Sequence, residues 1–473
     1  MEESVSTAAA RAGRQRIFTG HASYVFWVMF GISALNYLDR YVLTGAANKV
    51  AQELNFELDG IGYISSAFLV VYTLASLPLG IWADRVKRRS VVALCVAIWS
   101  VVTVATALAT NFVTLFISRM FLGIGEAGYF PAGTALMGDY FRREVRSRVM
   151  SWWSTAQLFG ILGGFGLGGV IAGLGPGQWR WAFVFTGIPG LLLAYLAWRV
   201  REPRRNQADE EALALSTEGT PLAETASVQP VISIRAILDQ IWSLLRIRSL
   251  AMLIIMQIFA FFVLGVNTTF LPTYLQQKDT FSLSSGLAGL YSGGVIVVAG
   301  IIGTLLGGYM ADVLNRRYPG ARILVCGIGF LLSAPAFALA VLLHDLVVFT
   351  IFFVLTAILV TVYTGPSTAA TQDVVPSIWR ASAVAITLLI AHLLGDAAAP
   401  TIVGVLATAL DPTGGTHFRQ HIAGQDLSMA LLFTCVPALI IAGLVGIFGA
   451  RWMEKDVAAA DEANRALRET RAG

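Results

Sequence analysis

Long apolar runs separated by short polar connections dominate the chain from Tyr24 onward. Each run holds roughly 20 residues, the length that an α-helix needs to cross a bilayer core about 30 Å thick. The twelve runs start near Tyr24, Gly60, Ser90, Phe112, Ser147, Trp179, Ser249, Ser284, Arg322, Leu346, Ala381 and Leu427. None alternates between apolar and polar residues as a membrane strand would. The pattern therefore predicts an all-α polytopic membrane protein with twelve transmembrane helices.

The composition agrees with a membrane protein. Of the 473 residues, 56% are hydrophobic and 13% are charged, whereas about 25% of the residues in a soluble domain are charged. The three cysteines, Cys95, Cys326 and Cys435, lie within apolar runs and lack the spacing of disulfide or metal motifs. The first twenty residues are polar and basic, so we expect no cleavable signal peptide. We expect neither a metal nor a cofactor.

Basic residues mark one side of the membrane. They gather between runs 2 and 3, between runs 4 and 5, and after run 6, at Arg85, Lys87, Arg88, Arg89, Arg142, Arg143, Arg146, Arg148, Arg199, Arg201, Arg204 and Arg205. Because such loops remain in the cytoplasm, both termini are predicted to be cytoplasmic, in an integral protein of the inner or plasma membrane. The pI near 9.0 reflects this topology and does not indicate a nucleic-acid partner.

An internal repeat divides the chain into two halves. GIWADRVKRR, from Gly80 to Arg89, recurs as GYMADVLNRR, from Gly308 to Arg317. Another set of residues recurs at one constant offset: Tyr129, Thr134, Ala135, Asp139 and Arg146 correspond to Tyr363, Thr368, Ala369, Asp373 and Arg380. Two such agreements in the same order predict two six-helix halves in parallel repeat.

The expected organisation has five parts. They are a cytoplasmic tail (1–20), an N-terminal six-helix half (21–200), a cytoplasmic linker with an amphipathic helix (201–248), a C-terminal six-helix half (249–450) and a cytoplasmic tail (451–473). The amphipathic helix is predicted from VISIRAILDQIWSLLRIRSL, whose apolar residues recur at helical spacing and whose basic residues suit an anionic membrane surface.

This organisation resembles the major facilitator superfamily. GIWADRVKRR is similar to that family's signature G-x-x-x-D-R-x-x-R-R in the loop between spans 2 and 3, and SRMFLGIGEAGYFPAGTALMGDYFRREVRSR is similar to its span 4 region and following loop. The resemblance implies a transporter whose two halves alternately open the binding site to either side of the membrane. A monomer suffices for this architecture.

The repeated signature predicts a latch. Asp84 and Asp312 begin short cytoplasmic turns, where a carboxylate can cap a helix N-terminus and pair with arginines such as Arg146 and Arg380. We expect these contacts to hold the cytoplasmic ends of the halves together while the protein faces outward. The predicted gating residues are Asp84, Arg85, Arg88, Arg89, Asp139, Arg146, Asp312, Arg316 and Arg317. For other charged residues in these loops, such as Lys87, setting the orientation of the protein in the membrane is enough to explain the charge.

Glycines at four-residue spacing predict close helix contacts. Span 5 carries Gly160, Gly164 and Gly168, and span 8 carries Gly303 and Gly307. Small residues at this spacing let helix backbones approach closely in lipid. In the resembled superfamily spans 5 and 8 are neighbours across the two halves, so the sequence predicts a sliding interface there.

Ionisable residues within the spans are few, and such residues are costly in a membrane and mostly functional. The predicted proton-coupling and substrate cavity consists of Asp39, Arg40, Arg119, Glu126, His392 and Asp396, with Asn36 and Asn267 as polar neighbours. Span 1 runs outward and span 4 inward, which places Asp39 and Arg119 at a similar depth of roughly 10 Å. We therefore expect Asp39 to pair with Arg119.

The remaining two charges are then available to each other or to a substrate. Arg40 points about 100° away from Asp39 around the helix, and Glu126 shares a helix face with Arg119. The second half has Phe353 and Val360 at the repeat positions of Arg119 and Glu126. An ion pair required by the fold is expected in both halves. This asymmetry therefore favours a functional role over a structural one for Arg40 and Glu126. For Asp39 and Arg119 either role stays open.

His392 and Asp396 lie four residues apart in HLLGDAAAP and share one helix face. No further metal ligand is near in the sequence, so the pair is predicted to serve as a proton relay, a substrate contact or a helix-packing hydrogen bond. These alternatives stay open.

Three segments resemble the Spinster group of the superfamily: NYLDRY (36–41), GIGEAGY (123–129) and HLLGDAAAP (392–400). The resemblance implies transport of lysophospholipids or sphingosine-phosphate-like lipids, with protonation of cavity acids coupling the movement. Span 7 departs from it, because NTTFLPTYLQQ is equally similar to transporters of small organic anions. A proton-coupled transporter of a small organic anion or sugar acid is therefore the alternative. A receptor or scaffold that does not transport is the alternative of another class, and no motif indicates an enzyme.

Overall fold

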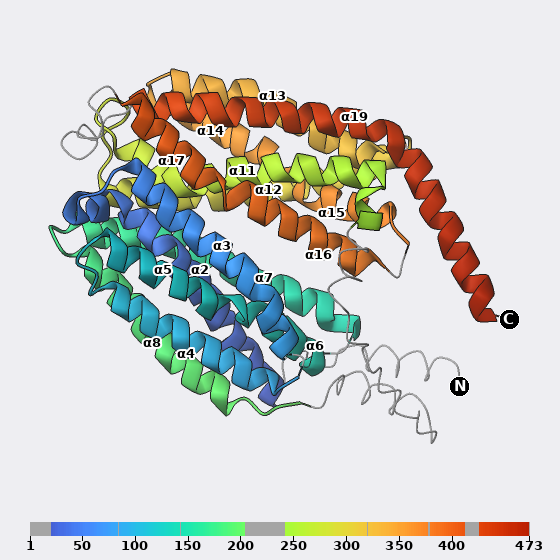
Figure 1. Ribbon diagram of the computed structural model, residues 1–473, viewed down its shortest axis with the longest axis horizontal. Helices are drawn as coiled ribbons and strands as arrows, with labels where there is room; N and C mark the ends of the chain where they lie inside the picture. Colours follow the sequence, from blue (N-terminus) through green and yellow to red (C-terminus); the bar gives the residue numbers. More distant parts are fainter. Residues whose placement is uncertain are drawn as a thin grey trace, which may run out of the picture.

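The computed structural model describes residues 20–83, 85–141, 143–203, 242–318, 320–376, 379–411 and 425–472, and it is helical throughout its regular elements. Figure 1 shows two groups of helices, one formed by the first part of the chain and one by the second. The first half contains α2 (Gly20–Leu54), α3 (Leu58–Ala83), α4 (Arg88–Thr106), α5 (Phe112–Ala127), α6 (Tyr129–Tyr140), α7 (Arg143–Gly173) and α8 (Trp179–Arg199).

The second half follows the same order. It contains α11 (Arg248–Gln276), α12 (Ser285–Asn315), α13 (Ala321–Leu342), α14 (Leu346–Thr361), α15 (Thr364–Asp373), α16 (Arg380–Ala391), the π-helical η2 (His392–Asp396), α17 (Ala399–Leu410) and α19 (Gln425–Ala472). Every predicted apolar run coincides with helix. Span 4 is divided into α5 and α6, span 10 into α14 and α15, and span 11 into α16, η2 and α17. The all-α prediction with twelve transmembrane segments is confirmed.

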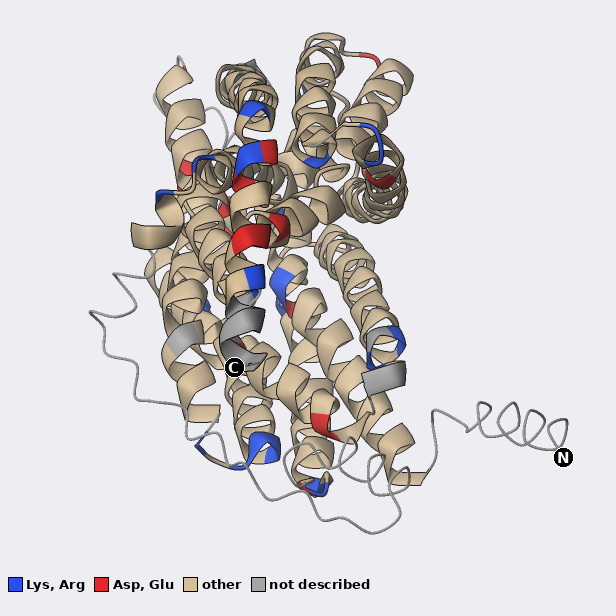
Figure 2. Cartoon of the chain, turned by 90° about the vertical axis from the view of Figure 1, so that its right-hand side faces the viewer, with Lys and Arg blue, Asp and Glu red and all other residues tan. Residues whose placement is uncertain are grey.

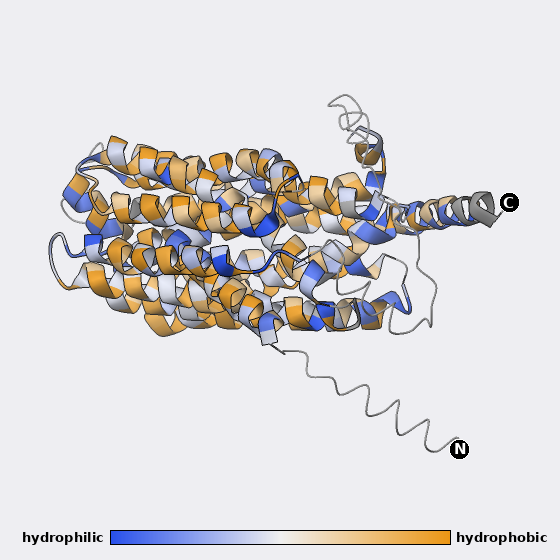
Figure 3. Ribbon diagram, turned by 90° about the horizontal axis from the view of Figure 1, so that it is seen from below, coloured by the Kyte–Doolittle hydropathy of each residue, from blue (hydrophilic) through white to orange (hydrophobic). Residues whose placement is uncertain are grey.

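Within the described residues, ten helical stretches are long and apolar enough to cross a membrane. The other two predicted spans are α2, which carries Asp39 and Arg40, and α5, which has 16 residues. These two elements supply four of the six charges of the predicted cavity, Asp39, Arg40, Arg119 and Glu126, so most of these charges lie on the two least lipid-like spans. Apolar residues cover most of the bundle, and hydrophilic residues are frequent on the part of α19 that projects beyond it (Figure 3).

The two halves begin their fourth helices in the same way. Asn111 caps α5 by accepting a hydrogen bond from the Thr114 N–H at 2.9 Å. Asp345, at the equivalent repeat position, caps α14 by accepting bonds from the N–H groups of Val347 and Val348 at 3.0 and 2.9 Å. Such caps satisfy helix N–H groups that would otherwise lack a partner. The repeat thus extends to single hydrogen bonds.

The predicted glycine stripes pack within the halves and do not join them. Gly160, Gly164 and Gly168 of α7 lie against the backbone carbonyls of Ala34, Leu38 and Val42 in α2. Gly303 and Gly307 of α12 lie against the carbonyls of Ile358 in α14 and of Val362, its C-cap residue. Spans 5 and 8 are neighbours across the halves, as predicted, but the prediction that these five glycines form their contact is wrong. Four-residue spacing identifies a closely packed helix face but does not identify the helix that packs on it.

The interface between the halves uses other glycines. In α7 and α12, Gly169 lies against the carbonyl of Ser285, and Gly289 against that of Phe165. A Cβ atom at either glycine would overlap that oxygen. We call this end of the bundle, where α2 ends and α12 begins, the seal end.

The opposite edge of the interface is formed by α3 and α17, also at the seal end. Gly62 lies against the carbonyl of Pro400. The Asp59 N–H donates to Thr408 Oγ1 at 3.3 Å, and the Thr401 N–H donates to Ser66 Oγ at 3.2 Å. The halves converge at this end, on the left of Figure 1, and diverge toward the other end.

The diverging end carries the repeated signature, and we call it the signature end. Figure 2 faces it and shows charged residues on its helix ends and loops. Arg88, at the start of α4, pairs with Asp139 in the first half. In the second half Arg322, at the start of α13, pairs with Asp373, the repeat counterpart of Asp139, so the two pairs are structurally equivalent. Each of these ion pairs joins two residues of the same half. They stabilise the halves separately.

The structure shows the latch residues with the halves apart at the signature end (Figure 1). Asp84 lies outside the described residues. Asp312 pairs with Arg322 at 3.5 Å, and Arg380 donates to the carbonyl of Gln372 at 3.1 Å. The latch was predicted for the outward-facing state, in which the halves meet at this end, so it stays a prediction.

The remaining signature residues also make contacts within their own half. Arg146 donates to the carbonyl of Gly138 at 2.7 Å, the repeat counterpart of the Arg380 contact. The N-terminus of α4 is capped by Glu202, whose carboxylate accepts bonds from the N–H groups of Arg88 and Arg89 at 2.7 and 3.0 Å. Arg85 and Arg317 contribute backbone N–H bonds to turns at the ends of α3 and α12, and Arg316 terminates α12 as its C-cap residue.

Two predicted peripheral segments are seen in part. The amphipathic helix predicted over 231–250 lies largely outside the described residues. The last helix, α19, passes the expected boundary at residue 450 without a break and continues beyond the bundle (Figure 1). Asp456, on this continuation, accepts a bond from the Ser249 N–H at the start of α11 at 2.9 Å, which ties the base of the extension to the second half.

Candidate functional site

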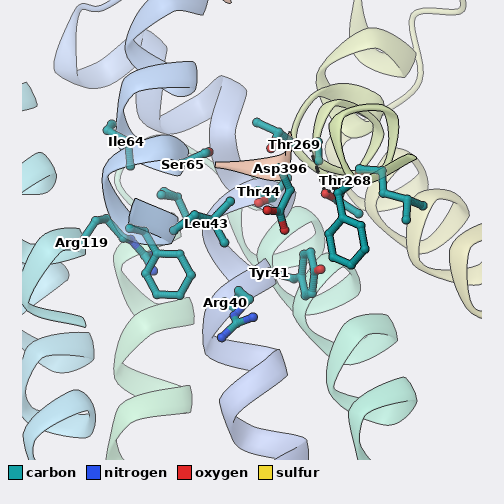
Figure 4. Close-up of a pocket in the computed structure, with 15 residues that line it drawn as sticks. Arg40, Tyr41, Leu43, Thr44, Ile64, Ser65, Arg119, Thr268, Thr269 and Asp396 are labelled. Atoms are coloured by element: carbon teal, nitrogen blue, oxygen red, sulfur yellow. Dashed lines mark hydrogen bonds between the residues drawn. The ribbon is translucent and has the colours of Figure 1, made fainter. Parts of the chain in front are cut away.

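A cavity of about 270 Å³ lies between the two halves in the middle of the bundle. Helices α2, α3 and α5 of the first half and α11 and η2 of the second half form its walls. Its lining residues are Arg40, Tyr41, Leu43, Thr44, Ile64, Ser65, Phe68, Leu69, Arg119, Phe261, Leu264, Gly265, Thr268, Thr269 and Asp396 (Figure 4). Three of the six predicted cavity charges, Arg40, Arg119 and Asp396, therefore reach the cavity surface.

Arg40 connects the cavity to a deeper acid. Its Nη2 atom donates to Glu126 Oε2 at 3.0 Å; the Arg40 side chain is 17% exposed and the Glu126 side chain is fully buried. Of the two options that the sequence left open, pairing between these residues is thus the one observed. A carboxylate buried in this way is stabilised only while a cation remains beside it.

Aromatic rings surround the Arg40 guanidinium. Its Cζ atom lies 4.7, 5.1 and 5.2 Å from the ring centroids of Tyr72, Phe68 and Tyr37. Rings at these distances attract a cation through their π faces. They hold the guanidinium between Glu126 on one side and the cavity on the other, so Arg40 can interact with either.

Asp39 and Arg119 do not form the expected side-chain ion pair. Arg119 Nη1 instead donates to the backbone carbonyl of Asp39 at 3.4 Å, and its guanidinium lies 5.0 Å from the Phe183 ring centroid. The Asp39 carboxylate faces the hydroxyls of Thr103 and Thr186 on α4 and α8. Because neighbouring residues point in different directions around a helix, Arg40 faces the cavity while Asp39 faces the interior of its own half. The two residues lie at the same level of the bundle, but the guanidinium is bonded to the backbone carbonyl of Asp39 and not to its carboxylate.

The two predicted polar neighbours differ in position. Asn36 is buried and lies beside Glu126, one helical turn before Arg40. Asn267 donates to the carbonyl of Val263 in its own helix at 2.7 Å and lines a separate small cavity within the second half. The structure therefore places Asn36 with the charged cluster and does not place Asn267 in the central cavity.

His392 and Asp396 form a bonded pair in η2. His392 Nδ1 lies 3.0 Å from Asp396 Oδ2, and the edge of the imidazole contacts the Phe261 ring with centroids 4.7 Å apart. Asp396 lines the cavity, whereas His392 lies beside it. The Ala397 N–H bonds to the carbonyl of His392, which makes the π turn. Single π turns of this kind occur frequently at functional sites.

Several cavity residues were not predicted from the sequence. Tyr41 stacks on Phe165 with ring centroids 4.9 Å apart, and Thr268 and Thr269 line the second-half wall. The tyrosines of NYLDRY, one turn apart on span 1, were an available signal for an aromatic wall. The threonines follow directly on Asn267, and helix rotation alone decides which of the three faces the cavity. Among the described residues, no three His, Cys, Asp or Glu side chains come close enough to hold a metal ion.

Two helical halves related by a repeat, joined at one end and enclosing a charged cavity at mid-depth, define a membrane transporter. The chain belongs to the Major Facilitator Superfamily, whose family model matches residues 29–400. Because this family consists of transporters, the expectation that the protein is not an enzyme is confirmed.

Similar proteins include members of the Spinster group, which confirms the resemblance seen in the sequence. Protein spinster homolog 1 of Xenopus tropicalis is 25% identical over 453 residues, which are 92% of this chain and 82% of that protein. The Homo sapiens protein of the same name is 28% identical over 461 residues, with 92% and 82% covered.

Solved structures agree on the fold. A bacterial homologue of the human lysosomal transporter Spinster, in an inward-facing and unoccupied conformation, matches with a TM-score of 0.79 at 24% identity, covering 93% of this chain and 98% of that one. A D-xylose–proton symporter matches with a TM-score of 0.64 at 16% identity, covering 92% and 97%.

Proposed function

We propose that this protein is a proton-coupled secondary transporter that moves an amphipathic lipid, such as a lysophospholipid or a sphingosine-phosphate-like molecule, by alternating access. The observation that carries the proposal is the Arg40–Glu126 ion pair, with the arginine at the cavity surface and the acid buried behind it. The resemblance to Spinster proteins supports the lipid class. Apolar and aromatic residues beside Arg40 and Arg119 offer a wall for an acyl chain next to a clamp for an anionic headgroup.

The coupling follows from the competition for Arg40. An anionic headgroup in the cavity attracts the guanidinium, and Glu126 then loses the cation that stabilises its charge. A buried carboxylate without a cationic partner favours its neutral form, so Glu126 takes up a proton. Linkage requires the reverse as well: a proton on Glu126 frees Arg40 for the headgroup. Substrate and proton therefore bind with positive cooperativity, and the complex that moves is close to electrically neutral.

The orientation is part of the proposal. We assign the signature end and both termini to the cytoplasm, because the basic residues of the loops gather there. With this assignment the contacts of α7 with α12 and of α3 with α17 close the cavity toward the outside. The signature residues, Asp84, Arg85, Arg88, Arg89, Asp139, Arg146, Asp312, Arg316 and Arg317, then hold the cytoplasmic ends together in the outward-facing state.

A small organic anion is the second candidate substrate. It is favoured by two arginines, Arg40 and Arg119, on the wall of a cavity of about 270 Å³, since paired arginines suit a carboxylate. This candidate uses the same Arg40–Glu126 exchange and differs in requiring no apolar surface for an acyl chain. Transport assays with the two substrate classes therefore distinguish the candidates. One variant, Glu126→Gln, tests the coupling mechanism that they share.

The test uses purified protein in liposomes that contain a pH-sensitive dye. Gradients of short-chain lysophospholipids or of small carboxylates are imposed, with empty liposomes as the control for lysolipid leakage. We expect proton flux driven by lysophospholipid in the wild type and none in Glu126→Gln. Glu454→Gln is the matched control, because Glu454 lies on the exposed extension of α19.

The outcomes separate the hypotheses. Flux with carboxylates alone would assign the protein to the organic-anion transporters. A Glu126→Gln variant whose transport still responds to the pH gradient would remove Glu126 from the coupling mechanism. Absence of flux with both substrate classes, in protein shown to be folded, would favour the receptor or scaffold alternative.

A further inference from the structure

We propose that Asp396 forms a second subsite of the cavity that binds the cationic end of a headgroup, so that a zwitterionic headgroup bridges the two halves with its anionic end on Arg40 and Arg119. This inference rests on the proposed function and narrows its substrate class to lipids whose headgroup carries an ammonium group as well as a phosphate. Asp396 then determines specificity among lysolipids, separately from the proton coupling at Glu126.

The charges of the cavity are divided between the halves. The first-half wall provides Arg40 from α2 and Arg119 from α5, whereas the only charged residue that lines the described second-half wall is Asp396. Figure 4 shows Asp396 extending into the cavity above Tyr41, with Arg40 below it. Tyr41 is close enough to interact electrostatically with both Arg40 and Asp396. The cavity is therefore positive on one half and negative on the other, with this tyrosine between the two poles.

Asp396 has bonding capacity that the protein does not use. Oδ2 is engaged by His392 Nδ1 at 3.0 Å, while Oδ1 has no hydrogen-bond partner among the described residues, although the side chain is only 16% exposed. A buried polar atom without a partner costs free energy, and native structures rarely retain one without a purpose. An ammonium group in the cavity would supply the missing partner. His392 engages only one of the two carboxylate oxygens, so Oδ1 stays available to a ligand.

The surroundings of Asp396 suit an ammonium group, including a quaternary one. Phe261 lines the cavity on the α11 side, and Tyr41 lines it from α2. Tyr41 is fixed in orientation by stacking on Phe165, with ring planes 26° apart. Aromatic faces near a carboxylate attract alkylated ammonium groups by cation–π interaction, even when the ammonium cannot donate a hydrogen bond.

The local fold places Asp396 at the cavity. A Cβ atom at Gly265 of α11 would lie 2.7 Å from the Asp396 Cα atom, and a Cβ at Gly395 would lie 2.6 Å from the Ile258 carbonyl oxygen. Two glycines thus allow η2 and α11 to touch through their backbones. The π turn interrupts the regular helix at this contact, and α7, the equivalent span of the first half, is one uninterrupted helix. The interruption occurs where the second half presents its acid.

A zwitterion and an anion therefore engage the protein differently. An anionic headgroup contacts the arginines of the first half, and next to Asp396 it is repelled or leaves Oδ1 without a partner. A zwitterionic headgroup contacts both halves at once, so its binding also favours their approach. A hydrogen bond or close contact to a charged group contributes about 1.5–3 kcal/mol. We therefore expect the protein to bind a zwitterionic lysolipid about 10- to 100-fold more tightly than an anionic one.

The experiment compares two lysolipids with the same acyl chain and different headgroups. Binding of lysophosphatidylcholine and of lysophosphatidylglycerol to the full-length protein in detergent is measured by competition against one fluorescent lysolipid. We expect the wild type to prefer lysophosphatidylcholine about 10- to 100-fold, and the ratio to fall close to one in Asp396→Asn. Asp461→Asn is the matched control, because Asp461 is exposed on the extension of α19 and its loss leaves the ratio at the wild-type value.

Asp396→Glu covers the case in which the amide variant does not fold. It keeps the charge near the cavity, so the preference for lysophosphatidylcholine is retained at least in part. Equal binding of the two headgroups by the wild type, or a preference that persists in Asp396→Asn, would overturn the inference and leave the proposed function standing. If folded wild-type protein bound small carboxylates but neither lysolipid, the proposed function would be overturned as well. The liposome flux assay tests the proposed function independently.

Discussion

The two halves of the protein share their ion pairs at the signature end and differ in the middle of the membrane. Arg88–Asp139 and Arg322–Asp373 occupy equivalent positions and make the same contact. By contrast, Arg40–Glu126 has no second copy, because Val360 stands at the repeat position of Glu126. A contact that a six-helix half needs in order to fold is kept in both halves. A contact kept in one is not required by the fold and is available for function.

The fourth span of the second half shows that the fold does not need charge at the positions of Arg119 and Glu126. Phe353 stands at the repeat position of Arg119 and is 4% exposed. It stacks on Phe349 with ring centroids 5.1 Å apart. Apolar packing stabilises α14 at the positions where α5 carries Arg119 and Glu126. The first half therefore bears the desolvation cost of those charges for a reason other than stability.

The largest effect is expected from separating the unrepeated pair. Arg40→Met leaves Glu126 buried without its cation, which should destabilise the protein by about 3–5 kcal/mol and abolish transport. Arg40→Met combined with Glu126→Leu removes both charges, so most of the stability should return while transport stays absent. Denaturant unfolding in detergent and uptake into liposomes measure the two effects.

The second half supplies the control for this experiment. Val360→Ala removes apolar volume at the position equivalent to Glu126 and should cost about 2 kcal/mol through the cavity that it leaves. Its transport should keep the response to pH. If Arg40→Met were as stable as the wild type, Glu126 would not depend on Arg40 and the coupling mechanism would lose its physical basis.

An intermediate effect is expected at the contact between the halves. Gly289→Ala places a Cβ atom against the Phe165 carbonyl, and such overpacking costs about 1–3 kcal/mol. The cost arises only while the seal end is closed, so the variant should shift the population toward an open seal end. Spin labels at Leu174→Cys and Leu287→Cys, both exposed positions at this end, report the shift as a longer distance. The three native cysteines are buried.

Gly294→Ala is the matched variant, one and a half helical turns further along α12. A Cβ at Gly294 would meet nothing within 4 Å, so the label distance should match that of the wild type. Equal distances in Gly289→Ala and Gly294→Ala would mean that the Gly289 contact does not control the closed state.

The sequence was sufficient for the fold but only partly for the site. Apolar length and the repeated signature predict the spans and the two halves, because both depend on residues close together in the chain. Elimination identified Arg40 and Glu126 as possible partners, because they remained once Asp39 was assigned to Arg119. The expected Asp39–Arg119 pair was wrong because depth does not fix the direction in which a carboxylate points. The π turn at His392 could not be predicted from the sequence either, because HLLGDAAAP is compatible with an ordinary α-helix.

The glycine stripes teach the same lesson on a larger scale. Gly160, Gly164 and Gly168 were correctly identified as a closely packed face, but the face packs on α2 of the same half. Spacing is a property of one helix, whereas the choice of neighbour depends on the whole bundle. Repeat symmetry helps here, because a contact found in one half can be sought at the equivalent position of the other.

The smallest effect is expected from the repeated ion pairs. Removing the equivalent aspartate from either half should lower the free energy of unfolding. Asp139→Asn and Asp373→Asn each remove one charge from the same type of pair. The Asp139 side chain is 6% exposed and the Asp373 side chain 32%, so solvent screens the second pair more. We expect losses of about 2 kcal/mol for Asp139→Asn and about 1 kcal/mol for Asp373→Asn, measured by denaturant unfolding in detergent. A larger loss in the second half, or a loss in only one half, would contradict the inference that repeated pairs stabilise the halves separately.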